Sequence, residues 1–155
     1  MIIGLISDTH GLLRPEAASA LAGVELILHA GDIGAPGVLD SLGAIAPVRA
    51  VRGNNDRDAW ASRLPATDVV EVAGASVYLL HDLHELDLDP AAAGMAAVVT
   101  GHSHKPLVRR DGDVLYVNPG SAGPRRFKLP ISVGRLRIAR GRVEAEIIEL
   151  DVAKP

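Results

Sequence analysis

Residues 1–10 read Met-Ile-Ile-Gly-Leu-Ile-Ser-Asp-Thr-His, and this stretch decides how the rest of the chain is interpreted. Its first six residues form an uninterrupted apolar run, which is typical of a strand buried on both faces. The run is followed by Asp8 and His10, two side chains that can ligate a metal ion. A lone Asp-x-His motif is a weak signal, because it occurs by chance in many proteins.

The same pattern returns four times along the chain. Further apolar runs are followed by Gly31-Asp32, Gly53-Asn54, His81 and Gly101-His102-Ser103-His104. Functional sites of open α/β sheets form beyond the carboxyl ends of the strands, so these tips are expected to converge. Five ligand-bearing strand ends, three with a glycine just before the ligand, predict a two-metal hydrolytic centre. The alternative, ordinary turn or capping residues, would have to apply independently at every position.

Length and composition predict an ordinary globular protein. The 155 residues, 48% hydrophobic and 23% charged, suit a single domain over residues 1–155 with a core of aliphatic side chains. With no cysteine in the sequence, any metal must be held by nitrogen and oxygen ligands. No apolar run has membrane-spanning length and no signal peptide is visible, so a cytoplasmic location is expected. The net charge of −3 predicts no strong non-specific binding to nucleic acid.

Strand and helix signals alternate in the first third of the chain. Strands are expected at residues 1–6, 24–28 and 48–51, with helices at 12–22 and 36–46 between them. Pro15 and Pro36 lie at the start of the two helical segments, where proline is favoured. This alternation predicts right-handed βαβ units and a parallel sheet.

Short strands dominate the remainder. The expected elements are a hairpin of strands 68–72 and 76–80, a helix at 86–95, a strand at 96–100, and hairpins pairing 107–110 with 114–117 and 131–138 with 143–150. The fold class is therefore α/β, with two sheets packed face to face, the second largely antiparallel, and helices outside.

The order and spacing of these motifs, over nearly the whole chain, closely resemble the calcineurin-like metallophosphoesterases, in particular their small single-domain phosphodiesterase branch. The resemblance implies a four-layer αββα sandwich with two mixed β-sheets. It also implies a metal-dependent phosphodiesterase with a dinuclear centre, in which a metal-bridging hydroxide attacks phosphorus in line. By similarity, the first metal is held by Asp8, His10, Asp32 and His104, and the second by Asp32, Asn54, His81 and His102.

The resemblance is imperfect at two positions. Many relatives carry a histidine where this chain has Asn55, and an amide can donate a hydrogen bond but cannot act as a general acid. This favours substrates with good leaving groups, or a metal-bound or bulk water as the proton source. Asp82 stands where relatives often have glycine, and it could either orient a ligand imidazole or restrict the pocket. His84 lies close enough in sequence to compete with His81 as the ligand.

Roles beyond the ligands follow from the same comparison. Catalytic roles are expected for Asp32, Asn54, Asn55 and Asp56, and substrate contacts for Asn55 and Arg125. Asp56 is expected to support the loop at residues 53–55, with capping as the alternative, and Arg125 could hold a phosphate or simply be solvated. His29 is expected to be a core histidine, hydrogen-bonded behind the site.

The expected cofactors are two divalent metal ions, with manganese favoured and nickel, cobalt, iron or zinc as alternatives. The expected substrate is a phosphodiester, either a small molecule or a nucleotide, and neither a membrane nor a nucleic-acid polymer is predicted as a partner. A homodimer is compatible with the sequence. A phosphomonoesterase on the same centre and a non-catalytic protein-binding scaffold of the same fold are the alternative functions.

Overall fold

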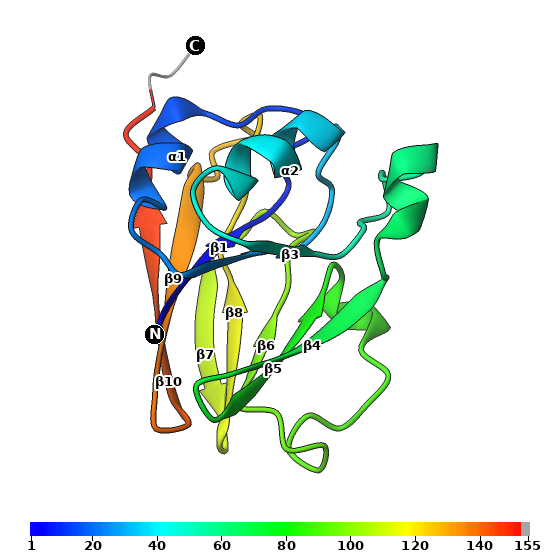
Figure 1. The fold of residues 1–155 in the computed structure, drawn as a ribbon. Coiled ribbons are helices and arrows are strands. Elements are labelled where there is room, and N and C mark those ends of the chain that lie inside the picture. Colours follow the sequence, from blue (N-terminus) through cyan, green and yellow to red (C-terminus); the bar gives the residue numbers. More distant parts are fainter. Residues whose placement is uncertain (153–155) are drawn as a thin grey trace.

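Two five-stranded sheets form the framework of the protein, and the computed structural model describes residues 1–152 (Figure 1). Sheet A has the order β10-β9-β1-β2-β3 and sheet B the order β4-β5-β6-β8-β7. Sheet A comprises β1 (Ile2–Ile6), β2 (Leu26–His29), β3 (Val48–Ala50), β9 (Ser132–Ala139) and β10 (Arg142–Glu149). Sheet B comprises β4 (Thr67–Val72), β5 (Ala75–Leu80), β6 (Ala97–Val99), β7 (Leu107–Asp111) and β8 (Val114–Asn118). All ten expected strands are present.

The alternation of side chains along β1 shows how the layers are held together. Ile3 and Leu5 point into the core between the two sheets, whereas Ile6 points into a second core beneath the helices. All three are fully buried, and each such side chain contributes ~1.5–3 kcal/mol to folding. The continuous apolar run at the N-terminus is therefore explained by burial on both faces, as expected.

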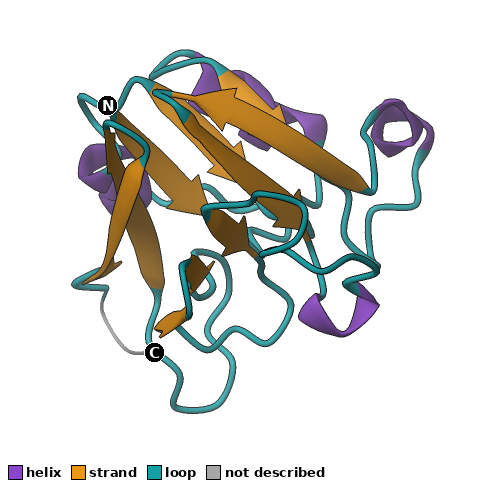
Figure 2. Cartoon of the chain, turned by 90° about the horizontal axis from the view of Figure 1, so that it is seen from below, coloured by secondary structure: helices purple, strands orange, loops and turns teal. Residues whose placement is uncertain are grey.

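Two α-helices cover the outer face of sheet A, and Figure 2 shows the helices at the periphery of the strands. They are α1 (Pro15–Ala20) and α2 (Pro36–Gly43), each with proline in its first turn. Both are shorter than expected. The residue before a proline favours extended backbone, and Arg14 adopts it with φ −71° and ψ 143°, so α1 begins only at Pro15.

The helix expected over residues 86–95 is wrong. The Asp89 carboxylate accepts hydrogen bonds from the N–H groups of Ala91 and Ala92, and the segment closes as a turn. Gly94, with φ 78°, ends the turn before a helix can extend. Within the described residues, the layer over the outer face of sheet B is therefore formed by this irregular connection rather than by an α-helix. Its apolar side chains are Leu83, Leu86, Leu88 and Met95.

The expectation that sheet B is largely antiparallel is also wrong. The hairpins β4–β5 and β7–β8 are antiparallel, but β5, β6 and β8 run parallel to one another. The connections from β5 to β6 and from β6 to β8 return the chain to its starting edge without a long helix. Two further elements, the 3₁₀ helices η1 (Ala59–Arg63) and η2 (Leu83–Glu85), lacked a sequence signal.

This topology places the ends of the central strands at one edge of the molecule. In sheet A, β1, β2 and β3 are parallel, and in sheet B, β5 and β6 are parallel, so each group ends at a common edge. The loops after these five strands carry the five ligand motifs. Among residues 1–152, no helix combines the length and apolarity needed to cross a bilayer.

Candidate metal centre

The side chains at the strand ends converge around one carboxylate oxygen. Oδ1 of Asp8 lies 3.3 Å from Nε2 of His104 and 3.9 Å from Nε2 of both His10 and His81. These residues come from the loops after β1, β5 and β6, so the two sheets contribute jointly to the site. Together with Asp32 they form what we call the ligand cluster.

The two carboxylates of the ligand cluster are each fixed by hydrogen bonds from the protein. Oδ2 of Asp8 accepts a hydrogen bond from Ser7 Oγ at 2.6 Å and from the backbone N–H of His102 at 3.0 Å. Asp32 accepts from the backbone N–H of Asn55 at 2.9 Å and from its side-chain amide at 3.1 Å. Asp32 Oδ2 also lies 3.3 Å from Nε2 of His81 and 3.8 Å from Nε2 of His10. Asp32 therefore stands between two imidazoles.

Unpartnered ligand atoms in this cluster fit a divalent metal. In the described part of the chain, four buried side-chain nitrogen or oxygen atoms make no hydrogen bond, and all belong to the ligand cluster: Asp8 Oδ1, His10 Nε2, His81 Nε2 and His104 Nδ1. Two groups of three residues offer ligand atoms within 4.8 Å of one another, Asp8-His10-His104 and Asp8-Asp32-His81. Burying polar atoms without partners is costly, and a metal ion bound here would satisfy them. Imidazole and carboxylate donors suit first-row transition metals.

The electrostatics of the cluster keep its carboxylates ionised. Burial raises the pKa of Asp32, but the neighbouring His81, the Asn55 N–H and the charge of His10 outweigh burial and lower it to about 2. For Asp8, burial is likewise outweighed by His104, Ser7 and His81, so its pKa lies below the ordinary value. Burial lowers the pKa of His81, but Asp32 and Asp8 outweigh burial and raise it overall. A metal ion at this place must displace protons from imidazole, so its affinity falls as the pH falls.

Backbone strain marks the ligand positions, and no sequence pattern predicts it. Eight non-glycine residues of the described chain have a positive φ, and five of them are predicted ligands: Asp8, His10, Asp32, His102 and His104. Left-handed backbone is unfavourable for residues with a Cβ and gathers at functional sites, where the surrounding structure enforces it. The strain turns these side chains from the strand ends toward one another.

The three glycines that precede ligands allow the loops to approach closely. A Cβ at Gly53 would lie 2.1 Å from Asp32 Oδ1, and a Cβ at Gly101 would lie 1.9 Å from Ser7 Oγ. At Gly31 it would lie 2.7 Å from His81 Nδ1. Any side chain at these positions would displace a ligand or its support. The glycine-before-ligand pattern therefore has a steric cause.

The replacement Gly53→Ala is expected to lower metal affinity by roughly tenfold or more, because the new methyl group occupies space held by the Asp32 carboxylate. Gly37→Ala is a matched control, since a Cβ there meets no atom within 4 Å. Calorimetric titration with Mn²⁺ compares the two variants. Equal affinities in both would show that the approach of Gly53 to Asp32 is not required.

His29 links two of the ligand loops from behind. Its Nδ1 accepts a hydrogen bond from the backbone N–H of Gly31 at 3.0 Å, so its Nε2 carries the proton and donates to Thr9 Oγ1, also at 3.0 Å. The Thr9 hydroxyl then donates to the carbonyl of Ile33 at 2.8 Å. Thr9 lies between two ligands and Gly31 precedes Asp32. The expected core histidine is therefore the bridge that joins the β1 and β2 loops.

Acidification is expected to destabilise the metal-free protein through His29. Burial is the main reason that the pKa of this imidazole falls from 6.5 to about 4, although nearby Asp8 and Asp56 oppose it. The unfolded chain binds a proton near pH 6.5 while the folded protein does not, so the free energy of unfolding falls by about 3 kcal/mol from pH 6.5 to 4. Urea unfolding at several pH values across this range measures how the free energy of unfolding changes with pH. If the unfolding free energy of His29→Leu fell as steeply with pH as that of the native chain, His29 would not be the source of the pH dependence.

The other predicted ligands lie around the cluster. His102 is partly exposed, with its ring 5.2 Å from that of His81 and Nε2 3.8 Å from Asp82 Oδ2. Asn54 is exposed in the loop after β3, between Gly53 and Asn55, which both contact Asp32. The side chain of His84 is 95% exposed, so the structure brings His81 rather than His84 into the cluster.

Three predicted catalytic or substrate residues make contacts within the protein. Asn55 is bonded to Asp32, as described above. The Asp56 carboxylate accepts hydrogen bonds from the backbone N–H groups of Ile33, Gly34 and Gly53, which matches the expected support of the loop and ties the β2 and β3 loops together. Arg125 donates to the carbonyls of Leu129 and Val152, so its guanidinium braces its own loop.

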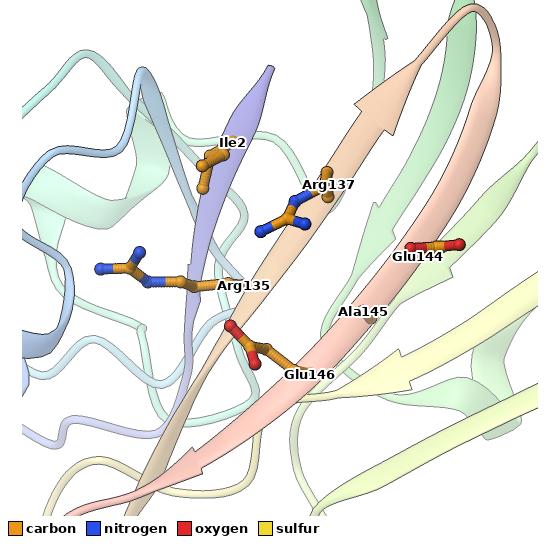
Figure 3. A pocket seen from close by; sticks show the side chains of 6 residues that line it. All are labelled: Ile2, Arg135, Arg137, Glu144, Ala145 and Glu146. Atoms are coloured by element: carbon orange, nitrogen blue, oxygen red, sulfur yellow. The ribbon is translucent and has the colours of Figure 1, made fainter.

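A separate hollow of about 120 Å³ lies on sheet A, away from the ligand cluster (Figure 3). Arg137 stands directly opposite Glu144 across the β9–β10 pair, and Arg135 opposite Glu146. Arg135 also donates to the carbonyls of Ala20 and Ala22 at the end of α1. Because basic and acidic residues alternate on these two paired strands, this face suits an ordinary polar sheet face, the interpretation favoured from strand alternation.

Comparison with known proteins defines the class. The profile of the calcineurin-like phosphoesterase superfamily domain matches residues 1–141. The chain is 39% identical, over 96% of its own length and 92% of the relative, to a probable metallophosphoesterase of Methanothermobacter thermautotrophicus. It is 30% identical to a phosphodiesterase of Methanocaldococcus jannaschii, over 77% of this chain and 83% of the relative.

Solved structures agree on the fold. A structure described as a novel archaeal phosphodiesterase superposes with a TM-score of 0.79 at 24% identity, covering 96% of this chain and all of the other. The protein therefore belongs to the calcineurin-like phosphoesterase superfamily, and the resemblance noted in the sequence is confirmed. Membership makes it a phosphoesterase hydrolase by class, and its ligand groups are suited to divalent metal ions.

Proposed function

We propose that this protein is a phosphodiesterase that works with two divalent metal ions held by the ligand cluster. The observation that carries the proposal is the group of four buried, unpartnered ligand atoms around Asp8 and Asp32. A structural site would be expected to satisfy its polar atoms internally. The relative named as a phosphodiesterase, at 30% identity, supports the choice of a diester substrate.

The chain offers two overlapping ligand sets. One ion would be held by Asp8, His10, Asp32 and His104, and the other by Asp32, Asn54, His81 and His102. The approach of Asp32 Oδ2 to both His10 and His81 supports its place between the two ions. Such ions offset charge on a phosphoryl group and lower the pKa of an attacking water molecule. Manganese is the favoured ion, with nickel, cobalt, iron or zinc as alternatives.

The loop after β3 bears on which phosphate esters the protein can hydrolyse, because it contains Asn55. Asn55 lies where a histidine could protonate a leaving group, and its amide instead donates to Asp32. We infer that Asn55 orients this carboxylate and supplies no proton to the substrate. Water is then the proton source, which favours diesters with good leaving groups over substrates that need a general acid.

The test is hydrolysis of bis(4-nitrophenyl) phosphate and of 4-nitrophenyl phosphate by metal-stripped protein. Mn²⁺, Ni²⁺, Co²⁺, Zn²⁺ and Mg²⁺ are added back one at a time. The proposal expects diester turnover that depends on added metal and exceeds monoester turnover. Faster monoester hydrolysis would indicate a phosphomonoesterase. No turnover with any ion would overturn the enzymatic proposal and favour the scaffold function.

A further inference from the structure

The connection between β8 and β9 lies at the metal edge of the molecule. Strand β9 runs antiparallel to β1, with Leu5 opposite Gly134, so β9 begins beside the end of β1. Residues 123–130 precede that point and are here called the 123–130 loop. In Figure 1 the connection, yellow to orange, lies at the same end as α1 and α2, opposite the β9–β10 turn.

This loop is fixed directly to the first ligand loop. Ser121 Oγ donates to the carbonyl of Asp8 at 3.1 Å, and the N–H of Ala122 donates to Ser7. A Cβ at Gly123 would lie 2.4 Å from the Asp8 carbonyl oxygen, so the two loops touch at backbone distance. Arg14 donates to the carbonyl of Gly123 from the other side. The base of the 123–130 loop is therefore held next to Asp8.

The tip of the loop carries a side chain that folding does not explain. Phe127 is the only phenylalanine of the sequence, yet it is 87% exposed. It also has φ 54°, which is unfavourable for an aromatic residue. Of the eight positive-φ residues with a Cβ, five are predicted ligands, and Ala73 and Arg140 precede glycines in hairpin turns. Phe127 is the eighth, and it lies in a turn that the N–H of Leu129 closes by donating to the carbonyl of Arg126 at 3.2 Å. The turn accounts for its backbone, whereas nothing in the packing accounts for its exposed ring.

Positive charge flanks the exposed ring. Arg126 and Lys128 on either side of Phe127 are both exposed. Arg125, in contrast, is occupied with the carbonyls of Leu129 and Val152 and braces the loop. The tip thus presents one aromatic side chain between two exposed cationic side chains, on a loop whose base contacts the Asp8 loop.

We propose that the 123–130 loop is a subsite for the nucleoside part of a nucleotide diester, with the base stacked on Phe127 and the phosphate charge offset by Arg126 and Lys128. The inference rests on the proposed phosphodiesterase function and names its substrate class. Stacking on an aromatic ring combined with cations is how proteins bind single nucleotides and unpaired bases.

Other occupants fit the tip less well. One aromatic ring buries at most ~150–250 Å², far below the ~1,200 Å² of a stable protein interface. Two cations are also fewer than the roughly four to eight basic residues that mark recognition of an anionic lipid surface. A nucleotide matches both the size and the charge of the tip.

The experiment compares two diesters with the same leaving group, thymidine 5′-(4-nitrophenyl phosphate) and methyl 4-nitrophenyl phosphate, in the metal-loaded protein. We expect kcat/KM to favour the nucleoside ester by roughly fivefold or more. Phe127→Ala should abolish this preference by raising KM for the nucleoside ester, with the methyl ester unchanged. Phe127→Trp should keep the preference. Val69→Ala, a substitution of another exposed apolar side chain, is the matched control.

The outcomes separate this inference from the proposed function. In one outcome both esters are hydrolysed while Phe127→Ala changes kcat/KM for neither of them, or for both by the same factor. That result overturns the subsite and leaves the proposed phosphodiesterase function intact. If no diester is hydrolysed, the proposed function fails. Calorimetric binding of thymidine 5′-phosphate to the native protein and to Phe127→Ala then tests the subsite by itself. A roughly fivefold or greater weakening in Phe127→Ala then supports the subsite; equal or absent binding in both proteins overturns it. Phe127-dependent binding to phosphatidylserine vesicles or dimerisation, without nucleoside preference, would also overturn it.

Discussion

The replacement Asp32→Asn is expected to reduce metal-dependent phosphodiester hydrolysis by roughly a thousandfold. Asn55 holds both oxygens of this carboxylate, and one of them approaches the imidazoles of His10 and His81. The amide keeps the size of the side chain but removes its negative charge and one acceptor atom. Because the residue stands between both ligand sets, the loss affects both ions.

Turnover of bis(4-nitrophenyl) phosphate and the bound metal content are measured together for this variant. Asp40→Asn, which changes an exposed carboxylate on α2, is the control and should retain full activity. Thermal unfolding confirms that both variants are folded. Activity of the Asp32 variant above about a tenth of the native level would contradict the shared-ligand role.

The replacement His29→Leu is expected to weaken Mn²⁺ binding by roughly 10- to 100-fold, although His29 is not a ligand. Without the imidazole, the buried N–H of Gly31 loses its acceptor and the Thr9 hydroxyl loses a donor. The unfolding free energy should also fall by about 3 kcal/mol, because these polar groups are left without partners. The loops after β1 and β2 would then no longer be linked to each other through His29 and Thr9.

Two comparisons separate positioning from general loss of stability. Thr9→Ser keeps the hydroxyl of the bridge and should retain metal affinity, whereas Thr9→Val removes the hydroxyl and should lower it. Val114→Ala opens a cavity at the start of β8, away from the metal edge, and should lower stability without changing affinity. Electron paramagnetic resonance titration with Mn²⁺ measures the affinities. An affinity loss in Val114→Ala equal to that in His29→Leu would show that the effect is not local.

The strands and the convergence of the ligands could be predicted from the sequence because both depend on local patterns. A buried strand needs an apolar run, and parallel strands end at a shared edge, so Asp8 and His104 could be brought together without a structure. The choice of His81 over His84 could not be made, since both follow β5 closely. Burial decides it: His81 is 5% exposed and lies against Ala30, whereas His84 lies in η2 in solvent.

The parts that could not be predicted depend on contacts distant in sequence. The left-handed backbone at His102 accompanies a hydrogen bond from its N–H to Asp8, 94 positions earlier. An arginine at position 125 is chemically suited to bind phosphate. Only its hydrogen bond to the carbonyl of Val152 shows that its guanidinium braces the loop. The helix expected at 86–95 failed because Asp89 and Gly94 together favour a turn, although both residues also occur at helix ends.

Anomalous diffraction from a Mn²⁺-soaked crystal tests whether the protein holds a dinuclear centre with Asp32 between the two ions. We expect two manganese peaks ~3.5–4 Å apart. One peak is expected near Asp8, His10 and His104, the other near His81 and His102, with Asp32 in contact with both. A single peak, or two peaks that Asp32 does not both contact, would show that the centre is not a dinuclear site shared through Asp32.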